Sequence, residues 1–387
     1  MHPNVIFAAG FLILFVGGGA RFAIGLTLKP MVDEFGWARG ELGLAVGAYM
    51  VVSAFATYLA GRWADRASPS LLLNAGVVVS AVGIGLMSLV GEPWHALVFY
   101  GVVFAVGNGM ASLTPVGVMV TRAFPGRAGF ANSAVISGMC VGQLVMIAAL
   151  AALLVQIGWR SVFVWLGLAH LVLIPFLVYA LPRRSEQDGA SAARGGLGVG
   201  QAARTPQFWL LLAIYAICGF DDFFVATHVV AFAQDRGVDA LLAGNLLAFM
   251  GLTGLVGLLA TGLVSDRAGP AWTSAIAFAT RVAVFALIAV DQSPLSIAVF
   301  ALAFGATFLV TAPMTVLFVR DHFGLKHLGA LTGLITMVHQ IFGGIGAWGG
   351  ALIFDATGTY DAAFILMLAV SALAMVLTLL LRQGRSE

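Results

Sequence analysis

Four ionisable side chains lie inside long apolar stretches of this 387-residue chain: Arg21, Asp221, Asp222 and Arg281. A charge at membrane depth is costly, so such residues face the interior of a helix bundle or a water-filled cavity and usually have a partner. A guanidinium can bind both oxygens of a carboxylate through its planar fork. These residue types indicate movement of an anion or a proton rather than covalent catalysis.

Several neutral polar side chains are expected at similar depth. His228 follows Asp221 by seven residues and so lies on the same helix stripe, where the two could pass a proton. His339 and Gln340 are adjacent in another apolar stretch, and they can bind a carboxylate, relay a proton or simply satisfy an interhelical hydrogen bond. Gln143 lies at a similar depth in another span, and Asn108 is a weaker candidate of the same kind for the cavity.

A short polar block occurs twice, as Gly61-Arg-Trp-Ala-Asp65-Arg66 and, 201 residues later, as Gly262-Leu-Val-Ser-Asp266-Arg267. A block repeated at half the chain length between apolar stretches indicates a duplicated membrane domain. At helix ends, such charge pairs can hold neighbouring helices in one state. We therefore expect Asp65, Arg66, Asp266 and Arg267 to serve in gating.

The same offset places Arg21 at the position equivalent to Asp221 or Asp222. We expect these residues to face each other across a central cavity, either as a pair that opens when substrate arrives or as a permanent ion pair. Arg281 lies in a span that should be peripheral. It is a candidate for substrate binding or for pairing with the other aspartate.

The composition places the chain in lipid. Hydrophobic residues make up 61% and charged residues 9% of the sequence, with a mean hydropathy of +1.02, whereas soluble domains carry roughly 25% charged residues. A net charge of only +2 argues against a nucleic-acid partner. No basic residue precedes Arg21, so we expect the first apolar run to be a retained span and not a cleaved signal peptide.

Crossing a bilayer takes about 20 apolar residues. The chain offers twelve such segments, at 4–28, 41–60, 70–90, 95–121, 128–156, 159–181, 207–233, 240–263, 271–290, 294–318, 327–354 and 361–382. We predict an all-α integral membrane fold of two pseudo-symmetric six-helix bundles, 1–182 and 207–387, joined by a cytoplasmic linker at 183–206 that is rich in Gly, Ala and charge.

Basic residues are distributed unevenly between the two sides of this topology. Thirteen fall on one side: Arg62, Arg66, Arg122, Arg127, Arg183, Arg184, Arg194, Arg204, Arg267, Arg320, Lys326, Arg382 and Arg385. Only four fall on the other: Lys29, Arg39, Arg160 and Arg236. The positive-inside rule puts the first set, and both termini, in the cytoplasm.

Motifs of enzymes are not expected to operate here. Gly344-Ile-Gly346-Ala-Trp-Gly349 matches the dinucleotide fingerprint, but no strand precedes it and it lies in an apolar helix. Gly346 and Gly350 are better explained as a small-residue face for close helix packing. Cys140 and Cys218 match no metal or redox spacing. We expect no cofactor, no metal and no enzymatic activity.

Together, the twelve segments and the repeated Gly-x-x-x-Asp-Arg block resemble the major facilitator superfamily. Within it, the chain is similar to bacterial monocarboxylate and oxalate–formate porters over Gly25 to Glu41, Cys218 to Phe220 with Thr227-His228, and His339-Gln340 through Asp355-Ala-Thr-Gly-Thr-Tyr360. The resemblance implies an anion-binding arginine in span eight, but this chain has Leu258 at that position. Arg21 or Arg281 is expected to supply the missing charge.

The resemblance implies a secondary transporter in the bacterial cytoplasmic (inner) membrane that moves a small organic anion, a mono- or dicarboxylate, by alternating access. Coupling would be proton symport or exchange for a counter-anion, and the carrier is expected to act as a monomer. Two alternatives remain. One is a proton-driven exporter of drug-like or amphipathic compounds with a wide, aromatic, acidic cavity. The other is a membrane sensor built on the same scaffold.

Overall fold

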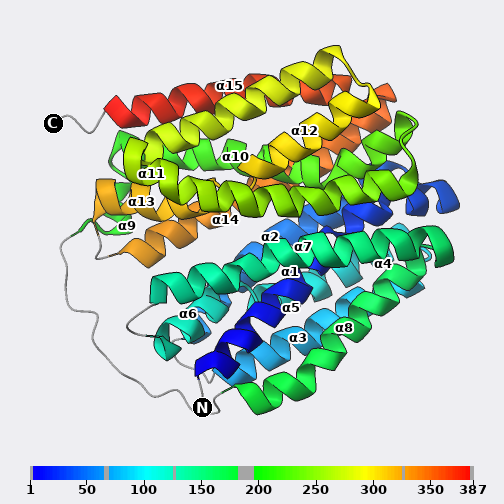
Figure 1. Cartoon of the computed structure of the whole chain (residues 1–387), viewed down its shortest axis with the longest axis horizontal. Helices are drawn as coiled ribbons and strands as arrows, with labels where there is room; N and C mark the ends of the chain where they lie inside the picture. The colour runs from blue at the N-terminus through cyan, green and yellow to red at the C-terminus, as the bar shows by residue number, and fades with distance from the viewer. Residues whose placement is uncertain (1–2, 65–68, 125–127, 182–195, 325–326, 384–387) are drawn as a thin grey trace.

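The computed structural model describes residues 3–64, 69–124, 128–181, 196–324 and 327–383, which form helices joined by short connections (Figure 1). The helices are α1 (Pro3–Phe35), α2 (Arg39–Ala64), α3 (Pro69–Leu86), the 3-10 turn η1 (Met87–Leu89), α4 (Pro93–Val98), the π-helical turn η2 (Phe99–Phe104), α5 (Ala105–Met110), α6 (Leu113–Ala123), α7 (Ala128–Ile157), α8 (Trp159–Ala180), α9 (Val199–Ala202), α10 (Pro206–Asp235), α11 (Ala240–Val290), α12 (Pro294–Thr307), α13 (Thr311–Phe323), α14 (Leu328–Thr357) and α15 (Asp361–Gln383).

Twelve helical stretches in the described part of the chain are long and apolar enough to cross a membrane, which confirms the predicted number. The first is longer than predicted and reaches Phe35. Two spans are joined in α11, where Gly269 has a φ of 80° and Pro270 follows it. Glycine adopts this left-handed conformation without steric cost, and proline suits the start of the second helix. The chain therefore bends between the two spans without an unpaired loop.

The fourth span is built from short pieces, namely α4, η2, α5 and the start of α6. Its π-helical turn carries Tyr100, which is almost fully buried, and α5 carries Asn108. Single π-helical turns inside helices occur often at functional sites, because they re-aim the side chains around them. The side chains of Tyr100 and Asn108 bond to α1 and α2, as described below.

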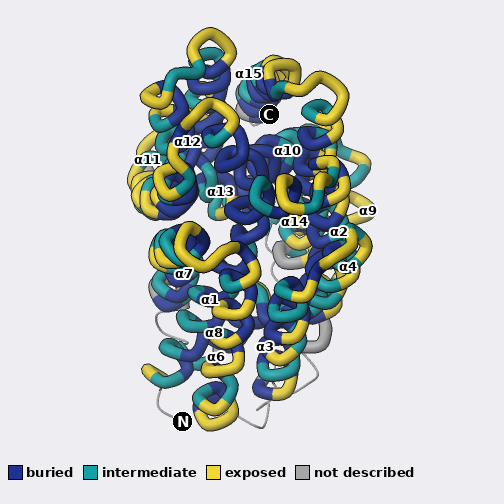
Figure 2. The backbone as a smooth tube through the Cα atoms, turned by 90° about the vertical axis from the view of Figure 1, so that its right-hand side faces the viewer, coloured by how far each residue is buried: buried dark blue, intermediate teal, exposed yellow. Residues whose placement is uncertain are grey.

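The helices are arranged in two bundles, with α1–α8 in one and α10–α15 in the other (Figure 1). Across the boundary α2 packs on α14, α7 on α11 and α1 on α10. Buried residues concentrate along the middle of the molecule, where these pairs meet (Figure 2). The start of α1 and the end of α15 lie at the same end of the bundles, as an even number of crossings requires (Figure 1).

The bundles meet along the half of the interface that lies nearer Arg39. On α2 and α14, contacts run from Ser53, whose hydroxyl is 3.4 Å from Gln340 Oε1, to Gly40, whose N–H donates to Asp355 at 2.7 Å. Toward the opposite end, Phe55 of α2 is 50% exposed, and a Cβ added to Gly333 of α14 would meet no atom within 4 Å. The bundles are therefore packed together at the Arg39 end.

Within the second bundle, α10 and α14 approach closely through glycines. A Cβ on Gly346 would collide with the carbonyl oxygen of Phe220, and a Cβ on Gly350 would collide with the ring of Phe224. The segment that resembles a dinucleotide fingerprint is thus the interior of a helix, and its glycines form the small-residue face that the sequence predicted.

Candidate substrate site between the two bundles

A small pocket lies where the two bundles face each other. It covers about 240 Å³ of space between atoms, part of which is open to solvent, and is lined by residues of α1, α2, η2 and α10. The lining residues used below are Arg21, Met50, Tyr100 and Phe223. Because both bundles contribute to the wall, a molecule in this pocket would contact both halves of the protein at once.

Arg21 is the charged group of the pocket. Its guanidinium carbon lies 4.6 Å from the centre of the Phe223 ring, and Nη2 is 4.0 Å from the sulfur of Met50. Its Nε is buried without a hydrogen-bond partner. No carboxylate among the described residues lies within 4.0 Å of it. A half-buried cation without a counter-charge leaves donors that can bind an incoming anion.

Aromatic hydroxyls support the wall around Arg21. The Tyr100 hydroxyl donates to the Arg21 carbonyl oxygen at 2.8 Å, and the Tyr49 hydroxyl donates to Asn108 Oδ1 at 2.8 Å. The Tyr49 and Tyr100 rings lie 4.8 Å apart. Asn108, which the sequence offered as a weaker candidate for the cavity, does not line the pocket; it bonds to Tyr49, whose ring lies against the lining residue Tyr100.

The two aspartates of α10 do not pair with Arg21. Nη2 of Arg281 lies 2.7 Å from Asp222 Oδ1, and Nη1 lies 3.9 Å from Asp221 Oδ2, with all three side chains almost fully buried. The expected ion pair between Arg21 and an aspartate is therefore wrong for this structure. The repeat aligns the positions along the chain, but α10 turns both carboxylates into its own bundle, where α11 supplies the cation.

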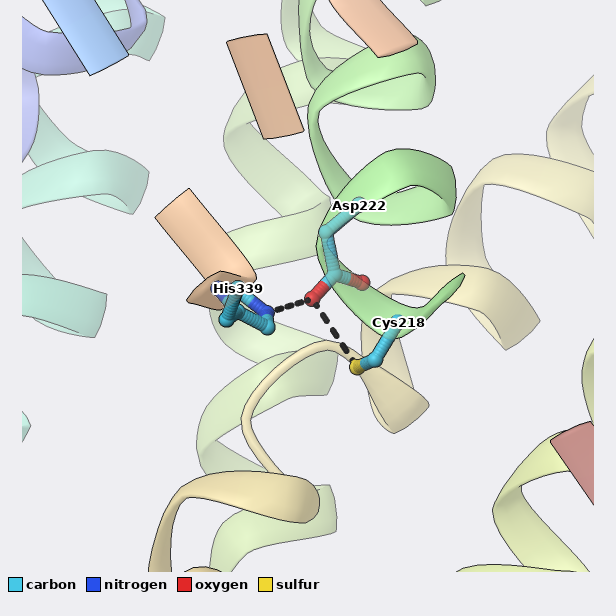
Figure 3. A group of neighbouring side chains, drawn as sticks. All are labelled: Cys218, Asp222 and His339. Atoms are coloured by element: carbon cyan, nitrogen blue, oxygen red, sulfur yellow. Dashed lines mark hydrogen bonds and ion pairs between the residues drawn. The ribbon is translucent and has the colours of Figure 1, made fainter. Parts of the chain in front are cut away.

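Asp222 is the centre of this buried cluster. Its Oδ2 lies 3.1 Å from Nε2 of His339 and accepts a hydrogen bond from the Cys218 sulfur at 3.5 Å (Figure 3). Arg281 is held in place by Thr307, whose hydroxyl accepts from Nε at 3.1 Å and whose carbonyl accepts from Nη2 at 3.3 Å. Arg281 thus forms an ion pair with Asp222 and also donates hydrogen bonds to Thr307.

Asp221 faces a different neighbour in the same bundle. Its Oδ2 accepts a hydrogen bond from the Ser371 hydroxyl of α15 at 2.6 Å, and its Oδ1 is buried without a partner. Arg281 thus serves both aspartates and does not reach the pocket. Of the two roles that the sequence left open for Arg281, the structure shows the pairing.

His228 is turned away from Asp221. Its Nε2 is 2.8 Å from the carbonyl oxygen of Ala347, and its Nδ1 is 2.9 Å from the Tyr360 hydroxyl. The shared stripe suggested that His228 and Asp221 could pass a proton, but in this structure each side chain bonds to other partners, and a proton-coupling role for His228 stays a prediction. The His228 ring is oriented by Ala347 of α14 and by Tyr360. The Asp221 carboxylate is oriented by other residues, on α11 and α15.

Two glutamines link the bundles. Gln143 is buried, and its Nε2 donates to the Leu247 carbonyl at 2.9 Å, which joins α7 to α11. Gln340 contacts Ser53 and joins α14 to α2. For Gln143 the interhelical hydrogen bond is therefore the observed contact.

The gating residues are mostly beyond the structural description. Asp65 and Arg66 lie outside the described residues, as does the side chain of Asp266. Arg267 is exposed on α11. Their gating role stays a prediction.

The sequence did not single out a charged network at the Arg39 end. Arg39 is only 5% exposed, and it donates to Asp235 at 2.9 Å and to the Tyr360 hydroxyl at 2.8 Å. Lys29 lies 3.4 Å from the same aspartate, and the backbone N–H of Arg39 donates to Asp355 at 2.9 Å. Burial raises the pKa of Tyr360, which keeps its hydroxyl protonated. These bonds tie α1 and α2 to α10 and α14.

We call these five residues, Lys29, Arg39, Asp235, Asp355 and Tyr360, the end latch. Arg39, Asp355 and Tyr360 all fall in the stretches that resemble carboxylate carriers, which was the available signal. From the sequence, Arg39 was expected only to lie on the less basic side of the membrane, and its burial was not predicted.

Cys218, Asp222 and His339 also place three potential metal ligands within 4.8 Å of one another (Figure 3). The guanidinium of Arg281 already lies against Asp222. A divalent cation there would face this fixed positive charge at close range in a buried site, so the group does not suit a metal.

Comparison with known proteins agrees with this architecture. The model of the major facilitator superfamily matches residues 10–347 and 211–387. The chain belongs to the major facilitator superfamily. Members of this family are membrane transporters, so this superfamily member is a multi-pass membrane transporter of small molecules and not an enzyme.

Three relatives illustrate the range of similarity. The superfamily member is 24% identical to monocarboxylate transporter 13 of Rattus norvegicus, over 93% of this chain and 84% of the relative. It is 24% identical to the oxalate:formate antiporter of Oxalobacter formigenes, over 71% and 66%. A crystal structure of a bacterial homologue of the human lysosomal transporter Spinster, in an inward-facing and occupied conformation, has a TM-score of 0.77 at 15% identity, over 99% and 97% of the two chains.

Proposed function

We propose that this transporter carries a small organic anion, a mono- or dicarboxylate, by alternating access. The observation that carries the proposal is Arg21, a half-buried guanidinium with an unpartnered Nε in a pocket shared by both bundles. A carboxylate would bring the missing negative charge and accept from the free donors. Monocarboxylate and oxalate–formate carriers among the relatives support this substrate class.

The shape of the pocket favours this proposal over an exporter of drug-like compounds. Such an exporter was expected to have a wide cavity with an acidic centre. The pocket instead is small and cationic, and the two aspartates are turned away from it toward Arg281. Phe223 and Met50 lie close beside the guanidinium, which favours a small substrate.

We also propose that the transporter lies in the bacterial inner membrane with both termini in the cytoplasm, and that it works as a monomer. The uneven distribution of basic residues supports the orientation. In this orientation the end latch would close the outer side of the pocket.

The test is uptake of labelled L-lactate, formate and oxalate into proteoliposomes that contain the purified full-length protein, with protein-free vesicles as background. We expect saturable uptake of at least one of these anions. Arg21→Lys should weaken its apparent affinity at least tenfold, because a point charge cannot reproduce the fork of the guanidinium. Arg160→Lys is the matched control, since Arg160 pairs with Glu34 at the surface. Normal affinity in the Arg21→Lys variant would overturn the proposal.

A further inference from the structure

The buried cluster of α10, α11 and α14 has an unbalanced charge. Asp221 and Asp222 are 0% and 1% exposed, and Arg281, also 0% exposed, offers one positive charge for the two carboxylates. An uncompensated charge in such surroundings is expensive, and a group that cannot find a partner binds or releases a proton instead. One added proton would make the cluster neutral.

The surroundings of Asp222 contain few other groups that could supply the balance. On its own helix, Cys218 donates a weak hydrogen bond to it and Asp221 lies beside it. From α11 comes Arg281, and from α14 comes His339. The residues of α13 and α15 that touch the cluster are the neutral Thr311 and Ser371. Among the described neighbours, the extra proton therefore belongs to an aspartate or to His339.

An unsatisfied oxygen marks the same deficit. Oδ1 of Asp221 is buried and accepts no hydrogen bond from any described residue. A buried, ionised carboxylate oxygen without a donor loses its hydrogen bonds to water and gains none from the protein. Protonation of either aspartate relieves this, because the remaining charge is then matched by Arg281.

His339 lies between the cluster and Phe223, a residue that lines the pocket. Its side chain is 19% exposed, whereas Asp222 is closed off, and its Nε2 donates to Asp222 whenever that carboxylate is ionised. Among the described residues no group bonds to its Nδ1, which can therefore accept a proton. The His339 ring lies 6.0 Å from the ring of Phe223, the same ring that supports Arg21.

We infer that this cluster is the site of the coupling ion, a single proton that enters through His339 and is held between Asp221, Asp222 and Arg281. This inference rests on the proposed function and specifies its coupling. An anion on Arg21 and a proton that enters at His339 lie on two sides of Phe223, and their opposite charges attract, so the binding of each favours the other. By linkage, the anion strengthens proton binding by the same factor as the proton strengthens anion binding.

The decisive variant is Asp222→Asn, because it leaves Asp221 and Arg281 as a balanced pair that needs no proton. In proteoliposomes, the natural protein should accumulate labelled L-lactate about tenfold for each pH unit by which the interior is more alkaline than the medium. Asp222→Asn should keep lactate–lactate exchange and lose accumulation. His339→Gln should also keep exchange and slow proton-driven accumulation at least tenfold. His327→Gln, a histidine just before α14, should behave as the natural protein.

A second measurement needs no substrate. Potentiometric titration of the purified protein against the Asp222→Asn variant should show one proton fewer in the variant between about pH 5 and pH 10. Equal titration curves, or lactate exchange by the natural protein without any response to a pH gradient, would overturn the proton site. If the natural protein transports none of the three anions, the proposed function is overturned instead. The titration would then still show whether the cluster binds a proton.

Discussion

At the scale of single residues, two arginines have opposite surroundings. Arg281 is enclosed and paired with carboxylates, whereas Arg21 stands on an aromatic ring with an unpartnered Nε. A buried cation that already has its counter-ions has no capacity left for a ligand. This difference is the reason that we propose Arg21, and not Arg281, for substrate binding.

Arg281 can be tested through stability. Arg281→Gln leaves two buried carboxylates without a cation, and breaking a buried pair in this way costs about 3–5 kcal/mol. We expect a clear fall in the thermal unfolding midpoint of the detergent-solubilised protein. Adding Asp222→Asn should recover part of the loss, since one orphaned charge is removed. Strictly additive effects of the two substitutions would show that the residues are not coupled.

At the scale of helices, the end latch joins α1 and α2 of one bundle to α10 and α14 of the other. Asp235 is its central acceptor, with Arg39 and Lys29 both against it. Charge-assisted hydrogen bonds of this kind contribute about 1.5–3 kcal/mol each. Loss of Asp235 should therefore shift the balance between states rather than unfold either bundle.

Asp235→Asn should open the Arg39 end of the interface. Spin labels on the ends of α2 and α14 should show a longer distance distribution in the variant, measured by pulsed electron paramagnetic resonance. Asp33→Asn is the matched control, because Asp33 pairs with Lys29 within α1 and is 58% exposed. An unchanged distribution in Asp235→Asn would show that the latch does not hold the bundles together.

The contact between α10 and α14 depends on glycine. Gly346→Ala would place a methyl group against the Phe220 carbonyl, and such overpacking costs about 1–3 kcal/mol. Three residues further on, a Cβ at Gly349 would meet no atom within 4 Å. We expect Gly346→Ala to lower the unfolding midpoint and Gly349→Ala to leave it unchanged or raise it slightly. A similar shift in both variants would contradict the packing argument.

At the scale of the whole molecule, the orientation can be tested without replacing the native cysteines, because Cys140 and Cys218 are both buried. Glu92→Cys and Arg204→Cys place a thiol at exposed positions near opposite ends of the bundles. In intact cells, a membrane-impermeant maleimide should label Glu92→Cys directly and Arg204→Cys only after permeabilisation. The reverse order of labelling would invert the proposed topology.

Much of this architecture could be predicted from the sequence, because length, hydropathy and the repeated block of Asp65 and Asp266 are local signals. The partner of Asp222 could not. A sequence offset places Arg21 and Asp222 at equivalent positions, but the rotation of α10 about its own axis decides which bundle a side chain faces. That rotation is set by packing against α14 at Gly346 and Gly350, which periodicity alone does not reveal.

The end latch has one more consequence, which concerns the ionic strength of the medium. Lys29 and Asp235 are 26% and 23% exposed, so dissolved salt can reach and screen them, with a Debye length of about 8 Å at physiological concentration. The cluster around Arg281 is 0–1% exposed and is shielded from such ions. Salt on the latch side would thus loosen the closure while leaving the proton site intact, so that the resting conformation of this carrier would follow the salinity of its surroundings.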